Sequence, residues 1–157
     1  MDLQIRQARA ADAIAAFACA QAAFAIYVDR IGKPPGPMLL DYAAEIAAGH
    51  VWVAETKGRI VGALVQFETK DGFYIDTVAA HPDAQGTGVG RALLVYAEQE
   101  ALRRGYDSLY LCTNEKMTEN QVFYPRIGYV ETARRLEDGY QRVFYRKSLG
   151  QGCDAVG

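Results

Sequence analysis

The pattern of hydrophobic and polar residues predicts a chain in which strands and helices succeed one another. Residues 3–8 ("LQIRQA") alternate apolar and polar positions, as a half-buried strand does. Asp12 is placed to cap a helix that follows. The apolar stripe of this helix is expected to consist of Ile14, Phe17, Phe24 and Val28.

The proline-rich stretch at residues 30–38 ("RIGKPPGPM") is expected to end this helix, because adjacent prolines cannot continue one. Residues 39–49 then predict a second helix that stops at Gly49. Three β-rich runs follow, at residues 51–55, 59–68 and 72–80, and the turn at residues 56–58 makes the first two a hairpin.

The second half of the chain predicts a helix, a strand, a helix and two strands. They cover about residues 91–104, then 107–113, 118–128, 129–133 and 140–149. In the first of these helices we expect Leu94, Ala97 and Ala101 on the buried face and the pair Glu100 and Arg104 on the exposed one. The strand–helix–strand order predicts that the strands at 72–80 and 107–113 are parallel neighbours.

These elements predict an α/β fold with a central mixed sheet of about seven strands and about four flanking helices. The length of 157 residues suits a single domain, here residues 1–149, with a flexible C-terminal tail at residues 150–157. Half of the residues are hydrophobic, which is enough for a core.

Charge and cysteine content exclude several functions. A net charge of −2 argues against broad nucleic-acid binding, which requires a basic excess. Cys19, Cys112 and Cys153 form no CxxC pair, so we expect no metal site and no disulfide framework; Cys19 and Cys112 are interpreted as small apolar fillers. No segment is apolar for long enough to span a membrane, and we expect a cytoplasmic protein.

Chemistry is indicated most strongly at residues 81–94, "HPDAQGTGVGRALL". Gly86, Gly88 and Gly90 stand on alternate positions directly before a helical run, where N–H groups are unpaired and the helix dipole is positive. Glycines allow a positive φ or the close approach of another group. The combination predicts a cradle for an anion such as a phosphate.

Two familiar phosphate loops do not fit this turn. The spacing is not that of GxGxxG, and no Lys-Ser or Lys-Thr follows the glycines. The pattern Q/R-x-x-G-x-G/A does fit, with Gln85, Gly88 and Gly90 in its fixed positions. Together with the long helix after it and "NQVFYPRIGYVET" at residues 120–132, the chain resembles the GNAT superfamily of acetyl-CoA-dependent N-acetyltransferases over residues 3–149.

The resemblance implies acetyl-CoA as the cofactor and gives a set of residues that bind it. The turn would hold the pyrophosphate of coenzyme A through the amides of residues 85–90, and the strand before it would pair with pantetheine. The implied cofactor-binding residues are Val78, Ala79, Ala80, Gln85, Gly86, Thr87, Gly88, Val89, Gly90, Arg91, Asn120 and Tyr124. Arg126 is a further candidate, with a solvated surface residue as the alternative. Asn114 is the alternative to Asn120.

The same resemblance implies direct attack of an amine on the thioester, with no covalent enzyme intermediate. Tyr124 matches the tyrosine of the family's Phe-Tyr pair and is expected to protonate the departing thiolate, since its pKa of about 10 suits that role. Asp76, in the strand before the turn, is the candidate base; an ordinary polar position on that strand is the alternative. His81 is interpreted as structural.

The acceptor is expected to be a primary amine on a small molecule or peptide, bound by the early, variable part of the chain. Tyr27 and Tyr42, together with Asp76, are the candidate substrate-binding residues, because acids attract a cationic amine and aromatic rings hold its chain. A packed helix pair with a polar rim is the alternative. The resemblance allows a homodimer through the last strands.

Two other functions stay open at this point. The chain could be a non-catalytic acyl-CoA-binding regulatory or scaffold protein, although the intact Phe-Tyr pair argues against this. It could also transfer an acyl group longer than acetyl. The sequence does not identify the acceptor amine.

Overall fold

Residues 2–150 are described by the computed structural model. The strands are β1 (Gln4–Gln7), β2 (Val51–Thr56), β3 (Arg59–Thr69), β4 (Gly72–Ala80), β5 (Ser108–Asn114), β6 (Val130–Glu137) and β7 (Tyr140–Ser148). The helices are α1 (Ala13–Phe24), α2 (Tyr27–Ile31), α3 (Tyr42–Ala47), α4 (Val89–Arg103) and α5 (Thr118–Arg126). Short 3-10 turns lie at Ala10–Asp12, Gly36–Met38 and Pro82–Ala84. The predicted tail and Cys153 lie outside the described residues, apart from Gly150.

Within residues 2–150 the strands form a seven-stranded mixed sheet in the order β1-β2-β3-β4-β5-β7-β6. The pair β4–β5 is parallel and the pairs β1–β2, β2–β3, β5–β7 and β6–β7 are antiparallel. This confirms the predicted α/β class and the parallel pair around the long helix. The described residues contain five α-helices rather than about four, because residues 27–31 form a helical turn of their own before the prolines.

The chain divides into two compact units, and the division crosses β3, β4 and α4. The first unit comprises Met1–Phe67 and Asp76–Ala97, and the second comprises Glu68–Ile75 and Glu98–Gly157. Each unit is described by itself below.

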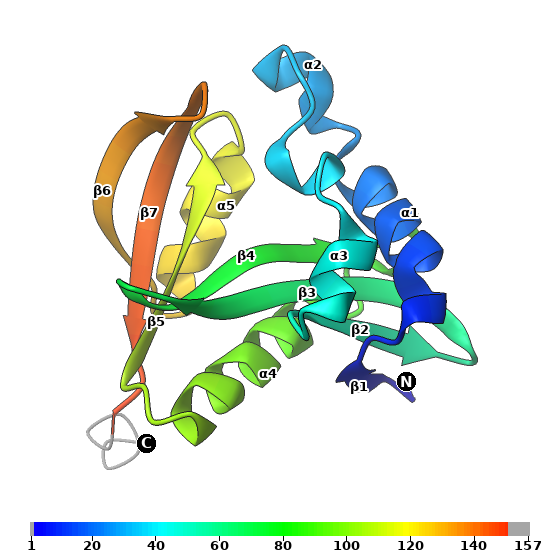
Figure 1. Cartoon of the computed structure of the whole chain (residues 1–157). Coiled ribbons are helices and arrows are strands. Elements are labelled where there is room, and N and C mark those ends of the chain that lie inside the picture. Colours follow the sequence, from blue (N-terminus) through cyan, green and yellow to red (C-terminus); the bar gives the residue numbers. More distant parts are fainter. Residues whose placement is uncertain (1, 151–157) are drawn as a thin grey trace. The chain divides into compact units, whose positions relative to one another are not determined.

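In the first unit, α1 and α3 pack on one face of the hairpin β2–β3 (Figure 1). The predicted apolar stripe of α1 is wrong at Ile14 and Phe17, which are 85% and 41% exposed, whereas Phe24 is half-buried and packs against the core. The buried face consists of small residues, Ala16, Cys19, Ala20 and Ala23. Small side chains let the helix approach the sheet closely, so the large ones are left outside. Val28 belongs to α2, not to α1.

Cys19 is the apolar filler that the sequence predicts. It is 1% exposed, and burial raises the pKa of its thiol to about 11. The other face of β3 receives α4: a Cβ at Gly62 would lie 2.8 Å from the Val89 side chain and 3.0 Å from that of Leu93. Glycine at this position therefore brings the start of α4 against the sheet.

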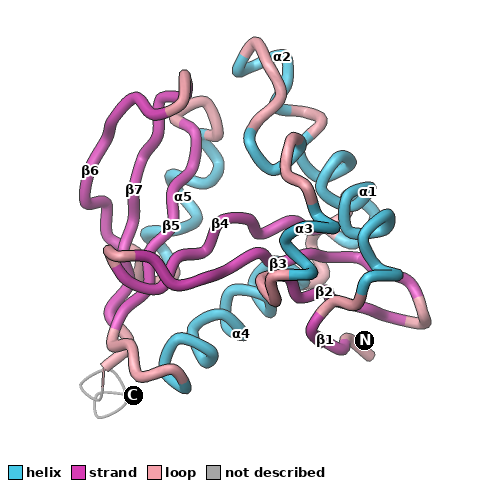
Figure 2. The backbone as a smooth tube through the Cα atoms, in the orientation of Figure 1, coloured by secondary structure: helices cyan, strands magenta, loops and turns pink. Residues whose placement is uncertain are grey.

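In the second unit, β5, β7 and β6 lie side by side, and α5 packs along them (Figure 2). Leu109, Leu111 and Thr113 are buried on the face of β5 toward α5, while Tyr110, Cys112 and Asn114 are half-buried on the other. Cys112 is therefore not a fully buried filler; its Sγ lies 3.3 Å from the Tyr74 hydroxyl.

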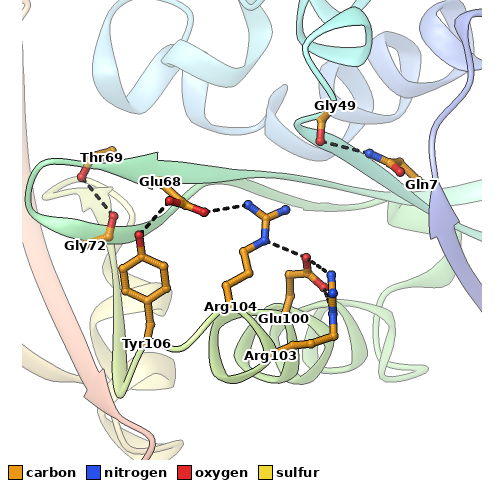
Figure 3. A network of polar contacts seen from close by, with 9 residues as sticks. All are labelled: Gln7, Gly49, Glu68, Thr69, Gly72, Glu100, Arg103, Arg104 and Tyr106. Carbon is orange, nitrogen blue, oxygen red and sulfur yellow. Dashed lines mark hydrogen bonds and ion pairs between the residues drawn. The ribbon is translucent and has the colours of Figure 1, made fainter.

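The C-terminal end of α4 belongs to the second unit and departs from the prediction. Glu100 was expected on the exposed face, but it is 6% exposed and accepts hydrogen bonds from Arg103 and Arg104. Arg104 also bonds to Glu68, which accepts a further bond from Tyr106 (Figure 3). A buried carboxylate with two guanidinium donors is satisfied, which explains why Glu100 is tolerated inside.

Candidate active site

The turn before α4 exposes a row of backbone donors. Within residues 2–150, five amides of this turn and the first helical positions have no hydrogen-bond acceptor: those of Gly86, Gly88, Val89, Gly90 and Arg91. Intrahelical bonding begins with the amide of Ala92, which donates to Gly88 O at 2.9 Å. Helix α4 starts at Val89, two residues earlier than predicted, so these donors also lie at the positive end of the helix.

Two of the three glycines are required by backbone conformation. Gly86 and Gly88 have φ values of +82° and +91°, which side chains rarely adopt, whereas Gly90 is helical. A Cβ added at any of the three would meet no described atom within 4 Å. The space in which a side chain would stand at these three positions is therefore open.

Two amides that were predicted to face the ligand are already used inside the turn. The amide of Gln85 donates to Pro82 O and that of Thr87 donates to Ala84 O, each at 3.2 Å. Their side chains are engaged as well: Gln85 Nε2 donates to Ala80 O at 3.4 Å, and the Thr87 hydroxyl donates to Ala84 O. Gln85 and Thr87 thus shape the turn and tie it to the end of β4.

The end of β4 carries the other predicted cofactor residues of the first unit. Pairing of β4 with β5 ends at Ile75↔Leu111, although β4 itself continues to Ala80. Val78 and Ala80 are half-buried and Ala79 is buried. His81 follows as a structural residue, as predicted: its amide donates to Val61 O at 2.8 Å, and its Nδ1 accepts from the amide of Asp83.

Asp76 is half-buried on β4, and its Oδ2 accepts a hydrogen bond from the Thr77 hydroxyl at 3.0 Å. Tyr42 lies near this pair. It is 2% exposed, and burial, followed by the charge of Asp76, raises the pKa of its phenol; a hydrogen bond with Thr77 acts in the opposite direction. The Tyr42 hydroxyl also donates to Pro37 O at 2.9 Å. Asp76, Thr77 and Tyr42 therefore form one connected polar group in the first unit.

Tyr27 lies at the start of α2 and has other neighbours. Its ring lies 6.2 Å from the ring of Phe24, and the Arg30 guanidinium lies 5.1 Å from the Tyr27 ring centroid. Arg91 is exposed on the first turn of α4, and Arg126 is exposed at the end of α5.

The second unit holds Asn120 and Tyr124 on α5. The Tyr124 ring packs against those of Tyr129 and Tyr145, with centroids 5.5 and 5.8 Å away. Tyr145 is buried, and Tyr129 is fixed by its hydroxyl bond to Glu98 at 3.0 Å. Asn120 Nδ2 donates to the Thr113 hydroxyl at 3.0 Å, which turns that side chain toward β5.

The comparison with protein families identifies the family of the chain. The model described as "Acetyltransferase (GNAT) domain" matches residues 47–131, more than half of the chain. The chain belongs to the GNAT acetyltransferase family. The match spans the hairpin β2–β3, the glycine turn, α4 and α5. Residues 3–46 and 132–149, over which the resemblance also extends, lie outside it.

Solved structures show the same GNAT fold at low sequence identity. PaiA N-acetyltransferase from Thermoplasma acidophilum, in complex with coenzyme A, is 15% identical with a TM-score of 0.78, over 94% of this chain and 99% of that one. Ribosomal-protein-S18-alanine N-acetyltransferase from Escherichia coli is 20% identical with a TM-score of 0.72, over 95% of each chain.

Nourseothricin acetyltransferase is 23% identical with a TM-score of 0.58, over 64% of this chain, which spans just under two thirds (65%) of that structure. No curated protein matches the sequence significantly.

Metal sites and membrane-spanning helices are both absent from the described part of the chain. In residues 2–150 no group of three or more His, Cys, Asp or Glu side chains is placed to hold a metal ion. Helices of the described part are all too short or too polar to cross a lipid bilayer.

The sequence analysis missed Thr77 as a partner of Asp76. Adjacent residues of a strand point to opposite faces, so the pattern gives no signal for a bond between their side chains. The sequence pattern also does not show which amides of the turn lack an acceptor, because this depends on the φ angles of Gly86 and Gly88 and on where α4 begins.

Proposed function

We propose that this chain transfers the acetyl group of acetyl-CoA to a primary amine, by direct attack with both substrates bound. The observation that carries the proposal is the set of five amides at Gly86 and 88–91 that have no acceptor within residues 2–150. They stand in the turn that carries the family's Q-x-x-G-x-G pattern. Backbone N–H groups at a helix start are a general means of binding phosphate.

The residues present fit the diphosphate of coenzyme A. The amides supply donors without a side-chain charge, and the open space over the glycines leaves room for the phosphate oxygens. Arg91, exposed beside them, would add a charge-assisted bond. We assign pantetheine to the backbone of residues 78–80. When bound, acetyl-CoA supplies an acetyl group that is already activated as a thioester.

We assign to Tyr124 the role of acid toward the departing thiolate sulfur. The assignment comes from the family's Phe-Tyr pair, and the packing of the Tyr124 ring against Tyr129 and Tyr145 supports it. A ring held by two fixed neighbours keeps its hydroxyl in one position, which a proton donor requires.

We assign to Asp76 the removal of a proton from the amine. The Thr77 hydroxyl donates to Asp76 Oδ2 and so holds the carboxylate in one orientation. Tyr42 is buried and its hydroxyl is bonded to Pro37 O, so we assign it a supporting role in the acceptor wall. Tyr27, half-buried at the start of α2, remains the candidate for direct contact with the acceptor.

An amine screen tests the proposal. Purified protein is incubated with acetyl-CoA and a panel of amino acids, polyamines, peptides and amino sugars, and free CoA thiol is followed over time. We expect thiol release that depends on both the amine and the enzyme, with mass spectrometry showing one added acetyl group. Saturable acetyl-CoA binding without release for any amine would favour the non-catalytic alternative.

The donor is tested in the same assay. Replacing acetyl-CoA with propionyl-, butyryl- and octanoyl-CoA measures how the rate depends on chain length. We expect acetyl-CoA to give the highest kcat/KM. A higher value for a longer donor would change the assignment from acetyl to acyl transfer.

A further inference from the structure

Two side chains on neighbouring strands of the second unit have hydrogen-bond donors that nothing in residues 2–150 accepts. Asn114 on β5 and Arg142 on β7 are directly opposite each other in the antiparallel pair, so they project from the same face of the sheet. Asn114 Oδ1 accepts from the amide of Lys116 at 2.9 Å, which leaves Nδ2 without an acceptor in the described chain.

Among residues 2–150, Arg142 makes its polar contacts through one guanidinium nitrogen, Nη1. Nη1 donates to Glu137 at 3.2 Å and lies 3.7 Å from Asp138, whereas Nε and Nη2 have no acceptor within residues 2–150. The side chain is nonetheless only 23% exposed. A largely buried guanidinium with unused donors is unfavourable, because those N–H groups have lost part of their contact with water.

The charged and polar groups around Arg142 are of two kinds. The pKa of Arg142 is raised overall. Burial acts to lower it, but this effect is outweighed by the Cys112 thiol and the Tyr74 hydroxyl and then by Glu137 and Asp138. The first two groups are ordinarily neutral at pH 7. The carboxylates are at its rim, with Asp138 83% exposed.

The other arginines of this face have already found partners. Arg135, opposite Arg142 on β6, bonds to Glu137 and lies 4.0 Å from the centroid of the Phe144 ring. Arg146 donates to Ser108 Oγ and Asp71 O, at 2.8 and 2.9 Å, and lies over the Tyr110 ring. Arg135 also has guanidinium N–H groups without an acceptor in residues 2–150, and Arg142 itself lies 5.6 Å from the Tyr140 ring centroid. What distinguishes Arg142 is that Asn114, directly opposite it on β5, has an unused amide donor as well.

We propose that Asn114 and Arg142 bind a carboxylate of the acceptor, so that the acceptor is an amino acid or another amine that also carries a carboxylate. A guanidinium edge beside an amide N–H matches the two oxygens of a planar carboxylate. A dianionic phosphate fits less well, because Glu137 and Asp138 stand at the rim. The inference rests on the proposed acetyl transfer for its statement about the acceptor, and it is tested first by binding alone.

The binding test uses product analogues. N-acetylglycine, N-acetylalanine, N-acetyl-β-alanine and N-acetyl-4-aminobutyrate are titrated calorimetrically into the protein with CoA present, each against its primary carboxamide. We expect one spacing to bind about 10- to 100-fold more tightly as the acid than as the amide, as for a charge-assisted bond. Arg142→Gln should reduce this preference below about 3-fold, and Asn114→Ala should reduce it partly.

Arg134→Gln is the matched control. Arg134 precedes Arg135 on β6, bonds to Glu131 and Gln121, and its loss removes the same charge from the chain. We expect this variant to keep the preference. Thermal unfolding of all variants identifies any that fail to fold, and Asn114→Ala then carries the test. No preference in the parent chain, or an unchanged preference in both Arg142→Gln and Asn114→Ala, would overturn the inference.

The free amino acids and their amides then enter the CoA-release assay. Acids that are acetylated with a lower KM than their amides would support both proposals. Selective binding of the acids through Arg142 without acetylation of any amine would uphold the carboxylate site and contradict acetyl transfer. Equal KM values for acids and amides would uphold acetyl transfer and contradict the carboxylate site.

Discussion

The glycine turn of the first unit and the face of β5 and β7 in the second unit that carries Asn114 and Arg142 both present donors without acceptors in residues 2–150, but they do so differently. At residues 86–91 the donors are backbone amides, held by two positive φ angles and by the start of α4. At Asn114 and Arg142 they are side chains, held by strand register and by neighbouring aromatic and acidic groups.

The two kinds of donor respond differently to changes in sequence. Backbone donors stay in place when side chains change, provided that glycines keep the conformation. Side-chain donors change with a single substitution. The proposed cofactor site therefore uses backbone donors, and the proposed acceptor site uses side-chain donors.

The two units also pack differently. The first unit brings α1 to the sheet with Ala16, Cys19, Ala20 and Ala23, whereas the second surrounds Tyr124 with the rings of Tyr129 and Tyr145. Close packing of small residues fixes the position of the helix, and aromatic packing fixes the position of the Tyr124 ring.

The largest effect should follow from Tyr124→Phe. Removal of the phenolic hydroxyl should lower kcat about 100- to 1000-fold, as expected for loss of a general acid, with little change in acetyl-CoA affinity. Tyr106→Phe is the matched control in the same unit, since the Tyr106 hydroxyl bonds to Glu68, its one hydrogen-bond partner among residues 2–150. Equal kcat values for Tyr124→Phe and the parent chain would remove Tyr124 from the acid role.

A smaller effect is expected from Gly88→Val. A β-branched residue at φ +91° strains the turn and moves the amides, so acetyl-CoA affinity should fall about 100-fold in calorimetry. Gly58→Val is the control, because Gly58 has φ +75° and equally open space in the hairpin turn. If both variants weakened binding alike, general strain rather than the turn would be responsible.

Asp12→Asn should destabilise the first unit by about 2 kcal/mol at pH 7. The side chain is 10% exposed, and hydrogen bonds from Arg6 lower the pKa of Asp12 from 3.8 to about 2. A lowered pKa stabilises the fold above pH 3.8, and this contribution is lost as the pH falls through 2. Urea unfolding should therefore show a difference between the two proteins that shrinks from pH 5 to pH 2.

Glu100→Gln makes the corresponding change in the second unit, with an expected cost of about 1 kcal/mol at pH 7. Burial opposes ionisation of Glu100, but bonds from Arg103 and Arg104 outweigh it and lower the pKa. The stabilisation is present above the unfolded pKa of about 4.3 and is lost as the pH falls through the folded value. A loss in urea unfolding that did not depend on pH would assign the effect to packing instead.

The sequence predicted the parts of the structure that have local signals. The glycine spacing at Gly86, Gly88 and Gly90 and the strand–helix–strand around it indicated the cofactor turn, the fold and the family. These features depend on residues that are close together in the sequence, so the order of the residues was enough to predict them.

Features that depend on distant partners were missed or mistaken. Ile14 and Phe17 were predicted to be buried because they are apolar and fit a helical stripe, but the close approach of α1 places its small residues on the buried face instead. Glu100 was placed outside because its pairing with Arg104 suits a helix surface. Arg142 could not be paired with Asn114 before the register of β5 and β7 was known.

Amide NMR during titration with acetyl-CoA tests the central claim most directly. The account predicts saturable downfield shifts of the amide protons of Gly86, Gly88, Val89, Gly90 and Arg91, because each gains an acceptor, while the amide of Gly58 does not move. Binding that left these five amides unchanged, or no binding at millimolar acetyl-CoA, would contradict it.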